Sequence, residues 1–345
     1  MNIYDISEKA GVSIATVSRV INKKDTVSAK TRDRVLAVMN EMGYTPNAFA
    51  RGLGLNTMKT IGILCTDVSD PYIASAVSYI EREMRDKGYD SLLVCSGYTL
   101  TNKKKSLKLL LSKRVDAVIL VGSQYRESSD NTHIAEASRH VPVMVINGYF
   151  DISNTYSSLC DDYASIYDVT NRFILQGRKD ILYVYDAETY SGMQKLSGFK
   201  NALTDAGIDL KENSIIRTER DIDVVFNRIS ELLENGVKFS AVVCSEDLFA
   251  AGVIKALHAH RKAIPEDVSV VGYNNSLISR CCQPECTSVD NKLEQLCINT
   301  ANMLIDIFQG KKPPYKTVIS AEIVNRETTL PWTKANSNNI LEVKR

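Results

Sequence analysis

The sequence contains no long apolar run and no strong excess of charge of either sign. No run approaches the roughly 18 apolar residues that a membrane-spanning helix needs. The net charge is +1 over 345 residues, so the chain as a whole is not a polycation. Hydrophobic residues make up 44% of the chain, which is enough for a sizeable core and excludes wholesale disorder. A chain of this length predicts two or three domains.

The first eleven residues also lack the features of a secretory signal. Such a signal has a basic start followed by an apolar block. Here Asp5, Glu8 and Lys9 are scattered among apolar positions instead. We therefore expect a cytoplasmic protein that does not enter a membrane.

The eight cysteines do not form a metal-binding pattern. Several lie in or at the ends of apolar runs, where a thiol behaves as a small hydrophobic group. Cys281, Cys282 and Cys286 form the only tight cluster, and no nearby His or further Cys completes a tetrahedral set. In a reducing compartment we expect ordinary free thiols and no bound metal.

Sequence motifs of common enzyme classes are missing as well. There is no G-x-x-x-x-G-K-[ST] phosphate loop, no H-E-x-x-H and no G-x-S-x-G. Asp161 and Asp162 are adjacent, so on an extended segment they would point in opposite directions and could not form a facing acid pair. His258 and His260 have no evident partner for a metal site. We predict no catalytic residues and no cofactor.

The charge is distributed unevenly along the chain. Residues 1–59 carry nine Lys and Arg against five Asp and Glu, a net charge of +4, which leaves −3 for the remainder. A small basic head on a mildly acidic body is typical of proteins whose head binds a polyanion.

The head has sharp helix boundaries. Ile3, Ile6 and Ala10 share one face of a first helix, and Gly11 ends it. Ser13 is a natural N-cap for a second helix over 14–21. Two short helices joined by a tight glycine-containing turn predict a helix-turn-helix.

A third helix should run from about 31 to 42, between a cap at Ser28 and a stop at Gly43. We expect its apolar residues to close a three-helix core, and these are Val35, Leu36, Met39 and Met42. A helical bundle without a nucleic-acid role is the alternative for this segment.

The outward face of the second helix is suited to DNA. Small residues allow close approach to a groove, hydroxyl groups suit phosphates, and Arg19 can donate a forked pair of hydrogen bonds to guanine. The residues on this face are Ile14, Ala15, Thr16, Ser18, Arg19 and Asn22.

The segment after the head predicts a marginal helix. Asn47 can cap about two turns, which is far below the length that is stable alone in water. Gly52 and Gly54 weaken it further, by roughly 1 kcal/mol each. We expect the segment to be ordered only when something packs on it, which would suit a switch.

The body alternates short apolar strands with segments of helical period. The expected strands are 60–65, 91–95, 117–121, 143–147, 180–184, 241–244 and 268–272. The expected helices are 73–87, 104–112, 162–176, 195–206 and 247–258. Two successive series of this kind predict two parallel-sheet lobes with helices on both faces.

Ligands of open α/β sheets bind beyond the carboxyl ends of the strands. Polar and aromatic side chains follow several of the expected strands or come from adjoining segments, which suits a sugar or a similarly polar small molecule. The candidate effector-binding residues are Asp70, Tyr72, Tyr98, Ser123, Asn147, Asp161, Tyr190, Lys195, Glu246 and Asn274.

Several motifs make the chain resemble the LacI/GalR family of bacterial transcription regulators. The most specific are Thr16-Val17-Ser18-Arg19-Val20-Ile21-Asn22, Gly43-Tyr44-Thr45-Pro46-Asn47, Pro265-Glu266-Asp267-Val268-Ser269-Val270-Val271-Gly272-Tyr273 and Asn325-Arg326-Glu327-Thr328-Thr329. The resemblance spans essentially Met1 to Pro331.

The resemblance implies a small all-α helix-turn-helix head, a hinge helix, and a two-lobed α/β body with parallel sheets like a periplasmic sugar-binding protein. The implied ranges are 1–46 for the head, 47–59 for the hinge and linker, 60–332 for the body and 333–345 for a flexible tail. The chain should cross between the lobes three times. We expect the first lobe at about 60–160 and 290–320, and the second at about 161–289 and 321–332.

The resemblance also assigns roles within a homodimer on a near-palindromic operator. Ile14, Ala15 and Arg19 would face base edges in the major groove, with Asn22 near the groove edge. The residues implied to contact phosphates are Tyr4, Thr16, Ser18, Ser28 and Thr31. The residues implied at the minor groove are Asn47, Ala50, Arg51 and Leu53, of which Leu53 would wedge between the central base pairs.

The candidate effector site departs from the family pattern. Members that bind neutral sugars usually have Asp at Asn147, Arg at Lys195, Asn at Glu246 and Asp at Asn274. An amide and a lysine offer different hydrogen bonds from a carboxylate and an arginine. A modified sugar or another polar metabolite becomes more favoured, and a phosphosugar less so, because only Lys195 supplies an evident cation.

The sequence thus predicts a ligand-responsive repressor of carbohydrate-utilisation genes, controlled by a sugar-like effector. The alternative is a sugar-metabolising α/β enzyme or a solute-binding protein with a fortuitous basic head.

Overall fold

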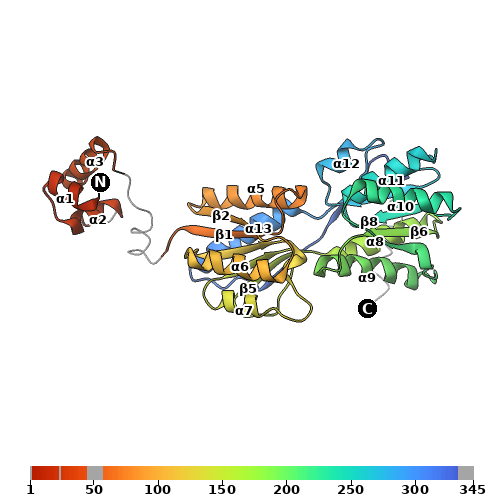
Figure 1. The fold of residues 1–345 in the computed structure, drawn as a ribbon, viewed down its shortest axis with the longest axis horizontal. Coiled ribbons are helices and arrows are strands. Elements are labelled where there is room, and N and C mark those ends of the chain that lie inside the picture. The colour runs from red at the N-terminus through yellow and green to blue at the C-terminus, as the bar shows by residue number, and fades with distance from the viewer. Residues whose placement is uncertain (1, 23–24, 45–56, 333–345) are drawn as a thin grey trace.

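The computed structural model describes residues 2–22, 25–44 and 57–332, which form a helical head and a two-lobed α/β body (Figure 1). The expectations for Asn47, Ala50, Arg51, Leu53 and the tail 333–345 lie outside these residues. Within the described ranges, no helix is both long enough and apolar enough to cross a membrane.

Three short helices make up the head. Each begins at a residue whose side chain accepts hydrogen bonds from the first turn: Asn2, Ser13 and Ser28. Gly11 ends the first helix in the left-handed conformation, at φ 61°. The helices are α1 (Ile3–Ala10), α2 (Ile14–Ile21) and α3 (Ala29–Glu41).

The head core contains Ile6, Val17 and Val35, which are fully buried. The prediction for Leu36 was wrong, because 43% of this residue is exposed. Helix α3 turns Val35 and Met39, one turn apart, toward the core, and Leu36 is rotated by about 100° from Val35 onto the outer face.

The first lobe is built on a six-stranded parallel sheet in the order β11-β5-β4-β3-β1-β2. Its strands are β1 (Thr60–Cys65), β2 (Asp90–Cys95), β3 (Ala117–Val121), β4 (Val143–Ile146), β5 (Thr155–Cys160) and β11 (Lys316–Ile319). Its helices are α5 (Pro71–Asp86), α6 (Leu100–Ser112), η1 (Ser123–Tyr125), α7 (Thr132–Ser138) and α13 (Leu293–Phe308).

Both faces of this sheet are covered because successive strand residues point to opposite sides. Ile61 and Ile63 pack with α5 and α13, whereas Leu64 packs with α6 and α7. Gly62 lies against α6, where an added Cβ would be 3.0 Å from Leu110. Figure 1 shows α5 and α6 on opposite sides of the strands.

The second lobe repeats this plan with the sheet order β12-β10-β9-β8-β6-β7, in which only the β10–β12 pair is antiparallel. Its strands are β6 (Ile181–Tyr185), β7 (Ile215–Arg217), β8 (Ala241–Cys244), β9 (Ser269–Tyr273), β10 (Thr287–Asp290) and β12 (Glu322–Val324). Its helices are α8 (Asp162–Leu175), α9 (Tyr190–Asp205), η2 (Glu212–Ser214), α10 (Ile222–Glu234), α11 (Asp247–Ala259) and α12 (Leu277–Cys281). Helices α8 and α9 cover one face of the sheet, and α10 and α11 cover the other.

The predicted fold class is confirmed: a helical head precedes two parallel-sheet lobes with helices on both faces. The chain passes between the sheets after β5, after β10 and after β11. The strands β5, β7, β10, β11 and β12 were not among the expected strands. β11 and β12 contain exposed and partly buried residues and no fully buried ones, so they lack the continuous apolar run of a buried strand.

Candidate functional site

Helix α2 presents an exposed face that contains the predicted base-reading residues. Ile14 is 39% exposed, and Ala15 and Arg19 are exposed beside it. No carboxylate pairs with Arg19 within the described part of the chain. Because Val17 and Val20 hold the opposite face of α2 in the core, the outward direction of these side chains is fixed by packing.

Most of the hydroxyls expected at phosphates lie at helix N-termini, and Ser18 lies in the middle of α2. Thr16 Oγ1 is 2.9 Å from Ser13 Oγ, and Ser28 Oγ donates to Thr31 Oγ1 at 3.0 Å. Ser18 Oγ accepts a hydrogen bond from Asn22 Nδ2 at 3.4 Å. Tyr4, in the first turn of α1, is 65% exposed. Free backbone N–H groups and hydroxyls at a helix start are well suited to anions.

A cavity lies between the two lobes, beyond the carboxyl ends of β1, β3, β4, β6, β8 and β9. Its free volume is about 60 Å³, room for a few water molecules. The structure brings seven of the ten predicted effector residues to its wall: Asp70, Tyr72, Ser123, Asn147, Lys195, Glu246 and Asn274.

The other three predicted effector residues do not line this cavity, and an effector-binding role for them stays a prediction. Tyr98 is 59% exposed. Asp161 caps α8 and accepts a hydrogen bond from the backbone N–H of Ala164 at 3.0 Å. Tyr190, the first residue of α9, places its ring 6.4 Å from the ring of Tyr149. Proximity to a strand end was thus not sufficient, because the following turn decides where the side chain points.

Two asparagines at the cavity wall have left-handed backbone conformations. Asn147 follows β4 at φ 55°, and Asn274 follows β9 at φ 94°. Asparagine is one of the few residues with a Cβ that adopts such angles readily. The unusual conformation therefore gives a backbone reason for asparagine at both positions, in addition to its hydrogen-bonding side chain.

A chain of buried polar groups links the lobes behind the cavity. Asn147 Nδ2 donates to Ser191 Oγ at 3.3 Å, and Ser191 Oγ donates to Asp162 Oδ2 at 2.5 Å. Tyr273 donates its hydroxyl to the other oxygen of Asp162, also at 2.5 Å. Asp162 is the first residue of helix α8, where the sequence predicted a helix to begin. Burial raises its pKa, and Lys195 and the hydroxyl donors oppose that rise.

Lys195 is buried and already contacts the protein's own polar groups. Its Nζ donates to the carbonyl oxygen of Ser245 at 3.1 Å and lies 3.7 Å from the centre of the Tyr273 ring. Lys195 thus reaches the cavity as part of the protein's own polar network.

A second cation, Arg220, joins the lobes at the cavity edge. Its Nη2 is 3.0 Å from Asp70 Oδ1 in the first lobe, and its Nε donates to Glu246 Oε2 at 2.8 Å in the second. Burial raises the pKa of Glu246 to about 7, although the charge of Arg220 opposes this shift. Sequence reasoning missed Arg220, which stands between β7 and α10.

Three residues of the cavity wall also contain buried polar atoms without partners. Within the described ranges, Tyr72 OH, Gln124 Oε1 and Ser245 Oγ are buried and make no hydrogen bond. Buried polar groups in folded proteins nearly always have partners, so these atoms can bind hydroxyls or amines of a ligand. Gln124, Asp186 and Ser245 were also missed, although each lies within a few residues of the end of β3, β6 or β8 and follows the same strand-end rule.

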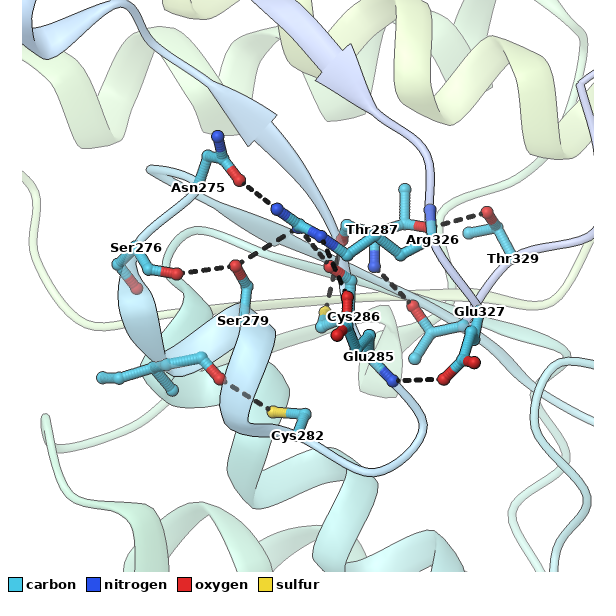
Figure 2. A network of polar contacts seen from close by, with 12 residues as sticks. Asn275, Ser276, Ser279, Cys282, Glu285, Cys286, Thr287, Arg326, Glu327 and Thr329 are labelled. Atoms are coloured by element: carbon cyan, nitrogen blue, oxygen red, sulfur yellow. Dashed lines mark hydrogen bonds and ion pairs between the residues drawn. The ribbon is translucent and has the colours of Figure 1, made fainter.

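Arg326 lies at the centre of a polar network next to the turn that carries Asn274 (Figure 2). Its guanidinium donates to Asn275 Oδ1 at 2.5 Å, to the carbonyl oxygen of Cys286 at 2.7 Å and to Ser279 Oγ at 3.3 Å. Asn275 follows Asn274 directly, so this network holds the turn that carries Asn274. Across the described residues, no group of three or more His, Cys, Asp and Glu side chains could hold a metal ion.

The two parts of the chain match two families. Residues 2–47 match the family described as bacterial regulatory proteins, lacI family. Residues 58–327 match the family described as periplasmic binding proteins and sugar binding domain of LacI family.

Two transcription regulators are similar to this chain over nearly its full length and theirs. An HTH-type transcriptional regulator of Lachnoclostridium phytofermentans is 52% identical over 331 residues, which cover 95% of this chain and 99% of that protein. The HTH-type transcriptional repressor PurR of Erwinia tasmaniensis is 30% identical, over 92% of this chain and 93% of its own length.

Solved structures share the fold. The lac repressor dimer bound to operator and the anti-inducer ONPF superposes with a TM-score of 0.86 at 24% identity, over 96% of this chain and 99% of that chain. A complex of the transcriptional regulator CelR with cellobiose gives a TM-score of 0.70 at 25% identity, over 95% and 99%.

Proposed function

This chain belongs to the LacI family of bacterial transcription regulators, and on that premise we propose that it is a dimeric repressor of carbohydrate-utilisation genes that responds to a sugar-like effector. The observation that carries the proposal is the pairing of a helix-turn-helix head with a polar cavity between two lobes. Binding to chromosomal DNA would place the protein in the cytoplasm.

The proposed DNA-reading surface is the exposed face of α2. We assign base contacts in the major groove to Ile14, Ala15 and Arg19, because all three are exposed on a helix that is fixed by its buried face. We assign phosphate contacts to Tyr4, Thr16, Ser18, Ser28 and Thr31, with Asn22 near the groove edge. The minor-groove roles of Asn47, Ala50, Arg51 and Leu53 belong to the same proposal and rest on the resemblance alone.

The proposed effector site is the interlobe cavity. Carboxylates, amides and hydroxyls without partners can bind the hydroxyls of a sugar, and CelR provides a relative whose complex contains cellobiose. The cavity of about 60 Å³ is too small for a sugar, so binding requires the lobes or a side chain to move. We therefore assign the effector to an opened form of the cleft.

The proposed mechanism couples this opening to the hinge. A change in the angle between the lobes would move the two first lobes of the dimer relative to each other and fold or melt the paired hinge segments. Roughly a few kcal/mol of difference in effector affinity between the two forms would be sufficient to shift such an equilibrium. We assign no catalytic step to the protein, in keeping with a family of regulators.

The test is selection of a preferred site from a random duplex library by the full-length protein, followed by fluorescence anisotropy with 5′-labelled duplexes. We expect a near-palindromic site that binds roughly 10³-fold or more tightly than random duplex, with affinity falling steeply with salt. Equal affinity for the selected and random duplexes would overturn the proposal.

A further inference from the structure

We propose that the interlobe cavity selects an effector that carries a positive charge, such as an amino sugar, and that this charge takes the place of the Arg220 guanidinium between Asp70 and Glu246. The inference rests on the proposed function, since it takes the cavity to be the effector site.

Negative charge predominates in the cavity. Its wall contains three carboxylates, Asp70, Asp186 and Glu246, but only one cation, Lys195. The Lys195 ammonium is already held by the carbonyl oxygen of Ser245 and the ring of Tyr273. Two of the three carboxylates share the single guanidinium of Arg220, and within the described residues Asp186 forms no ion pair.

Arg220 is the side chain that a ligand can displace most easily. Its side chain is 28% exposed and comes from the segment between β7 and α10. The two carboxylates that it contacts are held more firmly than Arg220, because Asp70 is the N-cap of α5 and Glu246 precedes the first residue of α11. A ligand that enters a cavity of about 60 Å³ can therefore gain room if the arginine swings out toward solvent.

Displacement of Arg220 has an electrostatic cost that depends on the ligand. A neutral ligand would leave the three carboxylates Asp70, Asp186 and Glu246 with Lys195 as the one remaining cation of the cavity wall, and an anion would add repulsion. A ligand with an ammonium group restores the lost charge pairing.

Proton uptake is the other way to relieve this repulsion. The charged groups around Glu246 are Arg220, Asp186, Asp70 and Lys195. Glu246 is the group to take up that proton, since burial already raises its pKa to about 7. A neutral sugar would thus bind with uptake of a proton near pH 7, whereas an ammonium ligand would not.

A second feature points to a polar ligand at the same place. Ser245 precedes Glu246, lines the cavity, is only 4% exposed, and its hydroxyl makes no hydrogen bond within the described residues. Gln124 Oε1, across the cavity wall, is also buried and without a partner, and it can accept a hydrogen bond from a ligand N–H or O–H.

The experiment compares matched sugars on the full-length protein by isothermal titration calorimetry at about pH 7. The pairs are D-glucosamine with D-glucose and D-galactosamine with D-galactose. We expect the amine of at least one pair to bind about tenfold or more tightly than its neutral partner, because truncating one member of a buried charge pair has effects of this size or larger. Equal or tighter binding of the neutral sugars, or no binding of any of the four, would overturn the inference.

Two buffers with different ionisation enthalpies report the proton balance in the same titrations. We expect no net proton uptake with the amine that binds. Uptake approaching one proton per site with that amine would contradict the charge-replacement argument.

Two variants test whether the preference for the amine arises at the cavity or elsewhere on the protein surface. Asp186→Asn should reduce the preference for the amine several-fold, whereas Asp306→Asn, which removes an exposed carboxylate paired with Lys311 on α13, should leave it unchanged. Ligand-free DNA binding is measured on the same preparations. Site-specific DNA binding without amine preference would overturn only this inference, and loss of site-specific DNA binding in the unaltered protein would overturn the proposed function.

Discussion

Arg220 and Asp70 face each other across the boundary between the lobes, with Nη2 of the arginine 3.0 Å from Oδ1 of the aspartate. The same guanidinium contacts Glu246 through Nε at 2.8 Å. One side chain therefore connects the first helix of one lobe to the start of α11 in the other. Any rearrangement that opens the cavity must break or move this contact.

The Arg220–Asp70 contact should be measurable by a double-mutant cycle with Arg220→Gln and Asp70→Asn. Asp70 is nearly buried, so we expect a coupling energy of about 1–2 kcal/mol in thermal or urea unfolding. The control cycle uses Arg228 and Glu231, whose side chains are 48% and 56% exposed and should couple by less than about 0.5 kcal/mol. Equal coupling energies in the two cycles would mean that the interlobe pair stabilises the protein no more than an exposed surface pair does.

Glu246 should make the stability of the ligand-free protein depend on pH. Its pKa in the folded protein, about 7, lies above the ordinary value of 4.5, so the folded state binds this proton more tightly than the unfolded chain. The contribution of Glu246 therefore becomes less favourable as pH rises from about 4.5 to about 7, by at most about 3 kcal/mol.

The matching variant is Glu246→Gln. At pH 5 the glutamate is protonated and the substitution should have little effect on Tm, whereas at pH 8 the variant should be more stable than the unaltered protein. Scanning calorimetry at both values measures this difference. A Tm difference between variant and unaltered protein that is the same at pH 5 and pH 8 would show that Glu246 titrates normally.

Arg326→Ala should destabilise the second lobe. The substitution removes the donors to Asn275 Oδ1 and the Cys286 carbonyl oxygen, and hydrogen bonds to charged groups contribute about 1.5–3 kcal/mol each (Figure 2). We expect the free energy of unfolding to fall by about 2–4 kcal/mol, measured by urea titration. Arg85→Ala, at a side chain that is 62% exposed, is the control and should change it by less than about 0.5 kcal/mol.

Arg19→Ala should reduce the sequence preference of DNA binding by roughly 1–3 kcal/mol and leave the fold intact, because Arg19 is exposed on α2. Anisotropy with the selected duplex and a version altered at one base pair measures the preference. Lys9→Ala, on the last turn of α1 where Lys9 pairs with Glu41, is the control. An unchanged preference in Arg19→Ala would exclude a base-reading role for this residue.

Much of the head could be read from the sequence because its determinants are local. Ser13, Gly11 and the apolar spacing of Val17 and Val20 act within one or two helical turns, and α2 has the predicted bounds of Ile14–Ile21. Strands such as β1 and β8 were equally clear, since a continuous apolar run flanked by polar residues is typical of a strand buried on both faces. Leu36 was misplaced because Val35 and Leu36 are adjacent apolar residues about 100° apart around the helix, and only packing decides which of the two faces the core.

The residues that line the candidate cavity could be predicted only in part from the sequence. The rule that ligands bind beyond strand ends selected Asn147, Glu246 and Asn274, which line the cavity, but it also selected Tyr98, which does not, and it omitted Asp186. Which of these side chains turns inward is decided by the backbone of each turn, and positive φ angles such as those of Asn147 and Asn274 are not visible in the sequence.

The amino-acid sequence by itself determined the three head helices and the alternation of strands and helices in the body, because hydrophobic period and helix caps are set by neighbours along the chain. Only the tertiary structure decided that Arg220 meets Asp70 and Glu246, and that Ser191 joins Asn147 to Asp162. The physical reason is that the energies of charges and buried hydrogen bonds depend on distance and on exclusion of water. Both are defined only once the two sheets have formed and their carboxyl ends have come together.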